Sequence, residues 1–149
     1  MAKVNLTDLA GQHLYMDANI FIYAVERHPD YLARLDGLFA QIDDGRVTAS
    51  TSEIPLAECL VKPFADNDPV RQGLYQAAIS PRQNFSVVPV SRAILIHAAQ
   101  LRALHKPRLP DAIHLATAMA SACQTLITND QLIRPISVIP VIQLVDLNV

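Results

Sequence analysis

The sequence predicts an α/β domain in which helices flank a parallel β-sheet. Short apolar runs of strand type alternate along the chain with longer segments of helical periodicity, the pattern expected of βαβ units. A chain of 149 residues, 51% of them hydrophobic, is also long enough to bury one sizeable core. We therefore predict a single domain over residues 1–149, with four to five parallel strands in a three-layer α/β/α arrangement.

The predicted strands are short apolar runs bounded by polar or turn-forming residues. They cover residues 14–16, 46–49, 85–90 and 126–127, and the tail from 136 to 145 supplies the last strand or strands. Parallel strands of this length are buried on both faces of a sheet, which suits their apolar composition.

Two helices are predicted between the first two strands. Residues 19–26 form a short helix that His28 and Pro29 stop. A longer helix ends near Gly45, and its apolar residues recur every three or four positions, as one buried face of a helix requires. These residues are Leu32, Leu35, Leu38, Phe39 and Ile42.

Four more helices are predicted after the second strand. Ser52 is a suitable N-cap for a helix that contains Pro55 in its first turn and Glu58 one turn later. A turn at residues 67–69 leads into a helix that ends near residue 78. Ser91 caps the next helix, and the last runs from Pro110 to about residue 122 and is apolar on most sides. The apolar side of the helix after Ser91 is predicted to contain Ile94, Leu95, Ala98 and Leu101.

Charge is unevenly distributed, although the formal net charge is only −2. Residues 69–110 contain six basic residues and no acid, whereas residues 1–68 contain eleven acids and five basic residues. A basic stretch of this kind is suited to holding a phosphate backbone, and it is equally consistent with solvated helix surfaces. The residues of this stretch that we predict to bind RNA are Arg92, Arg102, Lys106 and Arg108.

Cellular location is also constrained by the sequence. The N-terminus lacks the apolar segment of a signal peptide, and no apolar run is long enough to span a membrane. Cys59 and Cys123 lie in apolar helical segments, where we expect reduced, buried thiols. We therefore expect a cytoplasmic protein.

Four carboxylates lie where a parallel sheet would gather them. Asp17 and Asp130 follow predicted strands, Glu58 lies early in a helix, and Asp111 opens another helix. Sites in open α/β sheets form at the carboxyl ends of the strands. Four acids meeting there would repel one another unless a cation neutralised them, and Mg²⁺ and Mn²⁺ bind such oxygens together with phosphate groups. The sequence thus predicts metal-dependent phosphodiester chemistry.

Asp111 is the most telling of the four acids. An acid in the first turn of a helix complements the helix dipole, but the neighbours of Asp111 are so apolar that its charge needs a partner. The helix that follows contains no Lys or Arg, so we predict a metal as that partner. His114 lies one turn later, and we interpret it as a hydrogen-bonded core residue.

Four motifs resemble those of the PIN-domain ribonucleases, in particular the VapC-type toxins of toxin–antitoxin pairs. They are Asp17-Ala18-Asn19, the helical Leu56-Ala57-Glu58, the block at residues 109–118 and Thr128-Asn129-Asp130. The resemblance spans residues 14 to about 145, and the block at 109–118 is its most specific part.

This resemblance implies a Mg²⁺- or Mn²⁺-dependent endoribonuclease that forms a homodimer and has a small antitoxin protein as its partner. It implies catalytic roles for Asp17, Glu58, Asp111 and Asp130, with the three aspartates as metal ligands. Asn19 and Thr128 match its accessory polar positions. One of Ser50, Thr51 and Ser52 matches a further hydroxyl position, and the sequence leaves open which of the three it is.

Two other classes of function compete with this hypothesis. A phosphatase of the haloacid-dehalogenase type also has an Asp after its first strand, but it needs a second acid where this chain has Asn19. A PIN-like module could also bind RNA or protein without catalysis, although the complete set of four acids argues against that.

Overall fold

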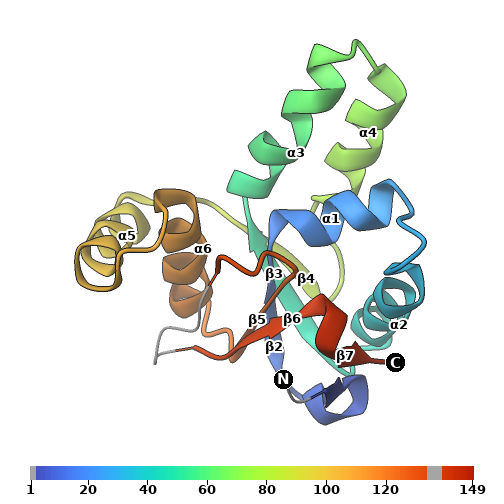
Figure 1. Cartoon of the computed structure of the whole chain (residues 1–149), viewed down its shortest axis with the longest axis horizontal. Coiled ribbons are helices and arrows are strands. Elements are labelled where there is room, and N and C mark those ends of the chain that lie inside the picture. The colour runs from blue at the N-terminus through green and yellow to red at the C-terminus, as the bar shows by residue number, and fades with distance from the viewer. Residues whose placement is uncertain (1–2, 134–138) are drawn as a thin grey trace.

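The central feature of the computed structural model is a five-stranded, fully parallel β-sheet (Figure 1). The structure describes residues 3–133 and 139–149. The strands lie in the order β4-β3-β2-β5-β6. Their bounds are His13–Met16 for β2, Thr48–Ser52 for β3, Phe85–Val88 for β4, Thr125–Thr128 for β5 and Val141–Gln143 for β6. The predicted α/β class and parallel sheet are confirmed.

The order of the strands places a topological switch point beside β2. From β2 the chain first builds outward through β3 and β4, and it then returns to place β5 on the other side of β2. Met16 pairs with Ile127 at the carboxyl ends of β2 and β5. In open α/β sheets, the point where the strand order reverses is where a crevice forms beyond the carboxyl ends of the strands.

Helices pack on both faces of the sheet. Helices α1 (Ala18–Val25) and α2 (Leu32–Asp43) cover one face, and α5 (Arg92–His105) and α6 (Leu109–Ala120) cover the other (Figure 1). Alternation along β2 divides the core accordingly. Leu14 and Met16 pack with the first pair of helices, and Tyr15 packs with the second pair.

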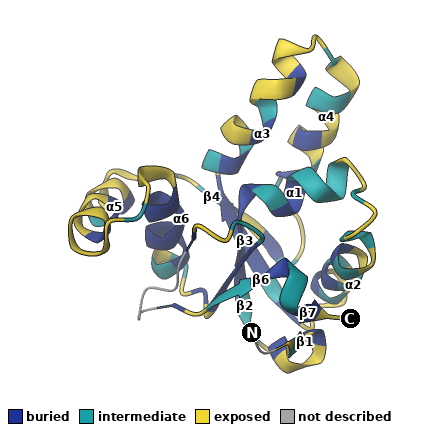
Figure 2. Cartoon of the chain, viewed as in Figure 1, coloured by how far each residue is buried: buried dark blue, intermediate teal, exposed yellow. Residues whose placement is uncertain are grey.

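Helices α3 (Ile54–Ala65) and α4 (Pro69–Ala78) form a hairpin that projects from the sheet. Most of its outer part is exposed, as Figure 2 shows. Pro55 occupies the first turn of α3, and Asp68 caps α4 by accepting a hydrogen bond from the backbone N–H of Arg71. Because α3 begins directly after β3, the hairpin holds Glu58 next to the carboxyl ends of the strands.

The structure contains a second, two-stranded sheet near the chain ends, which was not predicted from the sequence. Strand β1 (Val4–Asn5) pairs in parallel with β7 (Leu147–Asn148), and short 3-10 helices cover Leu6–Leu9 and Leu144–Asp146. Strands of two residues carry no periodicity that a sequence pattern could reveal. Of the predicted tail strand at 136–145, residues 136–138 lie outside the described residues, and only Val141–Gln143 is a strand.

The boundaries around β3 differ from the prediction. The strand covers Thr48–Ser52 where residues 46–49 were predicted, because its pairing with β4 continues to Ser52 opposite Val88. The N-cap position of α3 is therefore Glu53, and the prediction of Ser52 as the capping residue was wrong. Ser52 Oγ still accepts a hydrogen bond from the backbone N–H of Ile54 at 3.3 Å.

Other sequence predictions have mixed outcomes. Ser91 caps α5 as predicted, and Cys59 and Cys123 are buried free thiols. Leu95 was predicted to be buried but is 46% exposed, because the face of α5 that contacts α6 is narrower than the apolar pattern in the sequence.

Within the part of the chain that the structure describes, none of the helices has both the length and the apolar character needed to cross a lipid bilayer.

Candidate functional site

The four predicted acids line one pocket beyond the carboxyl ends of β2 and β5. Asp17 directly follows β2, Asp130 follows β5 by two residues, Asp111 lies in the first turn of α6, and Glu58 lies in α3. The pocket has a volume of about 360 Å³. The remaining residues around it are Ala18, Asn19, Ile22, Arg108 and Pro110.

Asp17 is held rigidly at the base of this pocket. Its Oδ1 accepts a hydrogen bond from the backbone N–H of Ala18 at 2.7 Å, so that Asp17 is the N-cap of α1. Its Oδ2 accepts a hydrogen bond from Thr128 Oγ1, also at 2.7 Å. Only 5% of Asp17 is exposed. These two hydrogen bonds hold the carboxylate group of Asp17 in a single orientation, as a metal ligand or catalytic group requires.

The two predicted accessory residues connect Asp17 with the segment that carries Asp130. Thr128 Oγ1 accepts hydrogen bonds from Asn19 Nδ2 at 3.2 Å and from the backbone N–H of Asp130 at 3.0 Å. In return, Asn19 Oδ1 accepts from the backbone N–H of Asn129 at 3.1 Å. Asn19 and Thr128 thus fix the relative positions of α1 and the loop after β5.

Arg108 bridges the other two aspartates. Its Nε donates to Asp111 Oδ2 at 2.7 Å, and its Nη2 donates to Asp130 Oδ2. A metal was predicted as the partner of Asp111 because the helix that follows contains no Lys or Arg. The structure adds a basic partner from outside that helix, since Arg108 is the residue at the N-cap position of α6. The acidic pocket therefore contains a guanidinium cation from the same chain.

The two aspartates respond differently to this arrangement. Burial raises the pKa of Asp111 above its usual value, and the hydrogen bond from Arg108 opposes that effect only in part. Burial also acts to raise the pKa of Asp130, but the hydrogen bonds from Arg108 and the backbone of Leu132 outweigh it, so the pKa of Asp130 is lowered. Asp130 is therefore the more strongly ionised of this pair.

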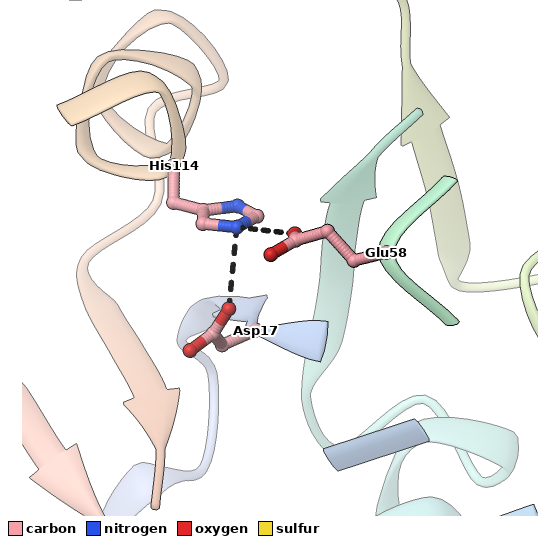
Figure 3. Close-up of side chains that lie close together, drawn as sticks. All are labelled: Asp17, Glu58 and His114. Carbon is pink, nitrogen blue, oxygen red and sulfur yellow. Dashed lines mark hydrogen bonds and ion pairs between the residues drawn. The ribbon is translucent and has the colours of Figure 1, made fainter. Parts of the chain in front are cut away.

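His114 contacts the other two acids, as Figure 3 shows. Its Nε2 lies 3.0 Å from Glu58 Oε1 and 3.3 Å from Asp17 Oδ1. Burial lowers the pKa of His114, but the hydrogen bond to Glu58 and the charges of Asp17 and Glu58 outweigh burial, so its pKa is raised. We interpreted His114 as a core residue, and it is indeed only 1% exposed, yet its ring faces the site.

A hydrogen-bonded chain connects His114 with the end of β3. Nδ1 of His114 lies 2.7 Å from the hydroxyl of Tyr15, which donates to Ser52 Oγ at 3.0 Å. Among the three candidate hydroxyl residues, Ser52 is therefore the one joined to the site. Ser50 bonds to His13 and Ser86, and Thr51 donates to the backbone carbonyl of Met16.

The basic residues predicted to bind RNA do not gather at the pocket. Arg108 alone of the four lines it. Arg92 and Arg102 are exposed on α5, and Lys106 is the left-handed C-cap of that helix. Arg102 also donates to the backbone carbonyl of Pro107 at 2.5 Å. These three residues offer positive charge on a neighbouring surface, outside the pocket itself.

The donor set suits a divalent cation. Four carboxylates provide the hard oxygen ligands that Mg²⁺ and Mn²⁺ prefer, and Asp17, Glu58 and His114 offer ligand atoms that all lie within 4.8 Å of one another. The pocket opens to solvent through the exposed parts of Glu58 and Asp130, so a cation and a phosphate group have access. The residues present therefore fit a metal-assisted reaction on a phosphate ester.

Comparison with known families identifies the class of protein. The sequence model of the PIN domain matches residues 14–137. This chain therefore belongs to the PIN domain family, as the motifs at residues 17–19, 109–118 and 128–130 suggested. That membership removes the haloacid-dehalogenase alternative.

Solved structures share the fold. VapBC2 from Rickettsia felis, bound to a DNA fragment from its promoter, is 20% identical, with a TM-score of 0.67 over 88% of this chain and 98% of that chain. DNA-bound VapBC from Salmonella typhimurium is 17% identical, with a TM-score of 0.60 over 89% and 98% of the two chains. VapC20 from Mycobacterium tuberculosis, described as a toxin that cleaves the Sarcin-Ricin loop, is 16% identical, with a TM-score of 0.59 over 76% and 86%.

At these identities, the likeness to VapC toxins shows that the fold is shared. It does not show that the substrate is shared. Among curated protein sequences, none matches this chain significantly. Substrate and partner must therefore be argued from the site.

Proposed function

We propose that this protein is a metal-dependent endoribonuclease and the toxin of a toxin–antitoxin pair. The observation that carries the proposal is the convergence of Asp17, Glu58, Asp111 and Asp130 in one pocket at the switch point of a PIN fold. Four acids from four separate parts of the chain repel one another when they are ionised. A bound cation offsets that repulsion, which explains why the fold brings these acids together.

In this proposal, Asp17, Asp111 and Asp130 hold Mg²⁺ or Mn²⁺, and Glu58 completes the site directly or through a water molecule. A bound cation polarises the scissile phosphate and lowers the pKa of the attacking water. Asp17 is prepared for this role by its two hydrogen bonds, which fix both oxygens before any ligand arrives. Thr128 and Asn19 act as positioning residues for Asp17 and Asp130.

Arg108 has two consecutive roles in the proposed reaction. Without a metal, its guanidinium neutralises Asp111 and Asp130. Its side chain is about half exposed, so it is free to turn toward the phosphate backbone once a cation has replaced it. Arg92, Arg102 and Lys106 would add affinity that does not depend on sequence, because phosphate contacts position a strand without reading its bases.

The proposed partner is a small antitoxin protein, and the proposed assembly contains a homodimer. The structures that share this fold include VapBC complexes, which supports an antitoxin partner. An arginine from such a partner could bond to the acids of the pocket, as Arg108 does here. The hairpin exposes four large apolar side chains, which supports protein contacts on that surface. They are Val61, Phe64, Val70 and Leu74.

One observation favours a second candidate, a PIN-like module that binds RNA or protein without catalysis. Arg108 supplies one internal cation, and His114 supplies a second when it is protonated; together they can balance the acids without any metal. A module of this kind would need no cation for folding or for binding.

The test is RNA cleavage by the purified chain in Mn²⁺, in Mg²⁺ and in EDTA. The nuclease hypothesis requires cleavage that depends on the cation and that leaves 5′-phosphate and 3′-hydroxyl ends. It also requires expression of the active chain to arrest growth, and co-expression of the neighbouring gene to relieve the arrest. Intact RNA in all three conditions, together with the absence of Mn²⁺ binding, would support the non-catalytic module.

A further inference from the structure

His114 lies where a nitrogen ligand of the proposed cation would lie. Its Nε2 is 3.3 Å from Asp17 Oδ1 and 3.0 Å from Glu58 Oε1 (Figure 3). Ligands about 2.1 Å from a cation stand about 3.0 Å apart when they occupy neighbouring octahedral positions. His114 Nε2 thus already has the spacing of an adjacent metal ligand to each carboxylate oxygen, and all three ligand atoms lie within 4.8 Å of one another. Asp17 directly follows β2, Glu58 lies in α3 and His114 lies in α6.

The second nitrogen of the ring has the partner that a metal-bound histidine needs. A histidine that binds a metal through Nε2 donates its Nδ1–H to an acceptor, which fixes the tautomer and the orientation of the ring. Here that acceptor is the hydroxyl oxygen of Tyr15 at 2.7 Å. Tyr15 donates its own proton onward to Ser52 Oγ, so its oxygen is available to accept.

Tyr15 is suited to this supporting role. It is fully buried, and its hydroxyl group has one proton to donate and lone pairs to accept. Because Tyr15 lies on the central strand and Ser52 ends the neighbouring strand, the ring of His114 is oriented by the rigid part of the fold.

We propose that His114 joins the carboxylates as a nitrogen ligand of the cation, at a position next to Asp17 and Glu58, and that it makes the site prefer transition-metal ions such as Mn²⁺ or Co²⁺ over Mg²⁺. This inference rests on the proposed metal-dependent function. Imidazole nitrogen binds transition metals more strongly than it binds Mg²⁺, which favours oxygen ligands alone. An all-carboxylate site would lack this preference.

The test is pulsed EPR of Mn²⁺ bound to the full-length protein, without RNA. A coordinated histidine adds nitrogen modulation to the Mn²⁺ echo, and this readout is independent of catalysis. We expect the modulation in the parent protein and in His97→Gln, which removes a histidine from α5. We expect none in His114→Gln, which keeps a polar side chain of similar size. Feeding ¹⁵N-histidine should change the modulation frequencies of the parent.

Binding measurements provide the second readout. His114→Gln should weaken Mn²⁺ binding by about tenfold or more while changing Mg²⁺ binding much less, so that the preference for Mn²⁺ falls. Tyr15→Phe, which removes the acceptor of Nδ1–H but keeps the ring, should also weaken Mn²⁺ binding by about tenfold. Equal losses for Mg²⁺ and Mn²⁺ in His114→Gln would contradict the nitrogen ligand.

The outcomes separate this inference from the proposed function. Specific Mn²⁺ binding by the parent without nitrogen modulation would overturn the role of His114 as a ligand and leave the metal-dependent nuclease intact. His114 would then be a positioning residue for Glu58. Failure of the parent to bind any divalent cation would instead overturn the proposed metal site, and the inference with it.

Discussion

Nε of Arg108 donates a hydrogen bond to Oδ2 of Asp111 at 2.7 Å, three residues further along the chain. The same guanidinium reaches Asp130, so one side chain neutralises two of the four acids. Arg108 therefore competes with a cation for these two carboxylates. A divalent ion that binds the Oδ2 atoms of Asp111 and Asp130 competes with Arg108 for them.

Removing that competitor should strengthen metal binding. Arg108→Gln is expected to lower the Kd for Mn²⁺ by about two- to fivefold, because a half-exposed ion pair contributes about 1 kcal/mol or less. Isothermal titration calorimetry of the apo protein measures this change. Arg102→Gln, which removes the same charge from α5, is the matched control. Weaker Mn²⁺ binding in Arg108→Gln would mean that the arginine supports the site and does not compete for it.

Loss of a single ligand should slow RNA cleavage strongly without unfolding the protein. Asp17→Asn, Asp111→Asn and Asp130→Asn are each expected to slow cleavage by about 100-fold or more, since that factor corresponds to a few kcal/mol of lost transition-state stabilisation. Single-turnover cleavage and circular dichroism would be measured together. Asp36→Asn, at an exposed position of α2, should retain full activity. Unchanged cleavage by Asp111→Asn would show that the site is wrongly assigned.

Divalent metal should stabilise the folded protein by mass action. An ion that binds only the folded state adds about 2.7 kcal/mol to the free energy of unfolding at 100 times its Kd. Thermal unfolding in Mn²⁺ should therefore occur at a clearly higher temperature than in EDTA. Asp17→Asn should show a much smaller difference between the two conditions. Superimposable curves for the parent would be incompatible with a metal site among these acids.

His114 should make metal-free stability depend on pH. Its pKa is raised in the folded state from an unfolded value of about 6.5, so its charged form contributes stability that is fully present below that value. This contribution is lost as pH rises through the folded-state pKa. Denaturant unfolding in EDTA would compare the parent with His114→Gln between pH 5.5 and 9. The advantage of the parent should shrink toward high pH, and an advantage that grew with pH would contradict this assignment.

The basic surface beside the pocket should contribute salt-dependent affinity for RNA. Replacing Arg92, Arg102 and Lys106 with Gln in an inactive Asp111→Asn background should reduce the slope of log K against log salt by up to about 2, because fewer counterions are released. Fluorescence anisotropy across a salt series would measure the slope. A matched triple variant at Arg27, Arg46 and Lys62 controls for net charge. Equal slopes in both variants would show that RNA approaches by another face.

Much of the fold followed from local patterns. Helical periodicity predicted α2 and α5, and apolar runs predicted the strands on which Asp17 and Asp130 depend. These elements were predictable because a buried face leaves a regular spacing in the sequence. The pairing of β1 with β7 was not predictable, because it joins two-residue segments from opposite ends of the chain, and segments so short have no periodicity.

The sequence by itself determined the four acids, their accessory residues Asn19 and Thr128, and the elements that carry them. The tertiary structure alone decided how the acids are paired. His114 looked like a core residue because its neighbours in the sequence are apolar, and its contacts with Asp17 and Glu58 arise only when α6, β2 and α3 pack together. Hydrogen bonds and ion pairs between distant segments depend on distances of a few ångströms, and no local spacing encodes such distances.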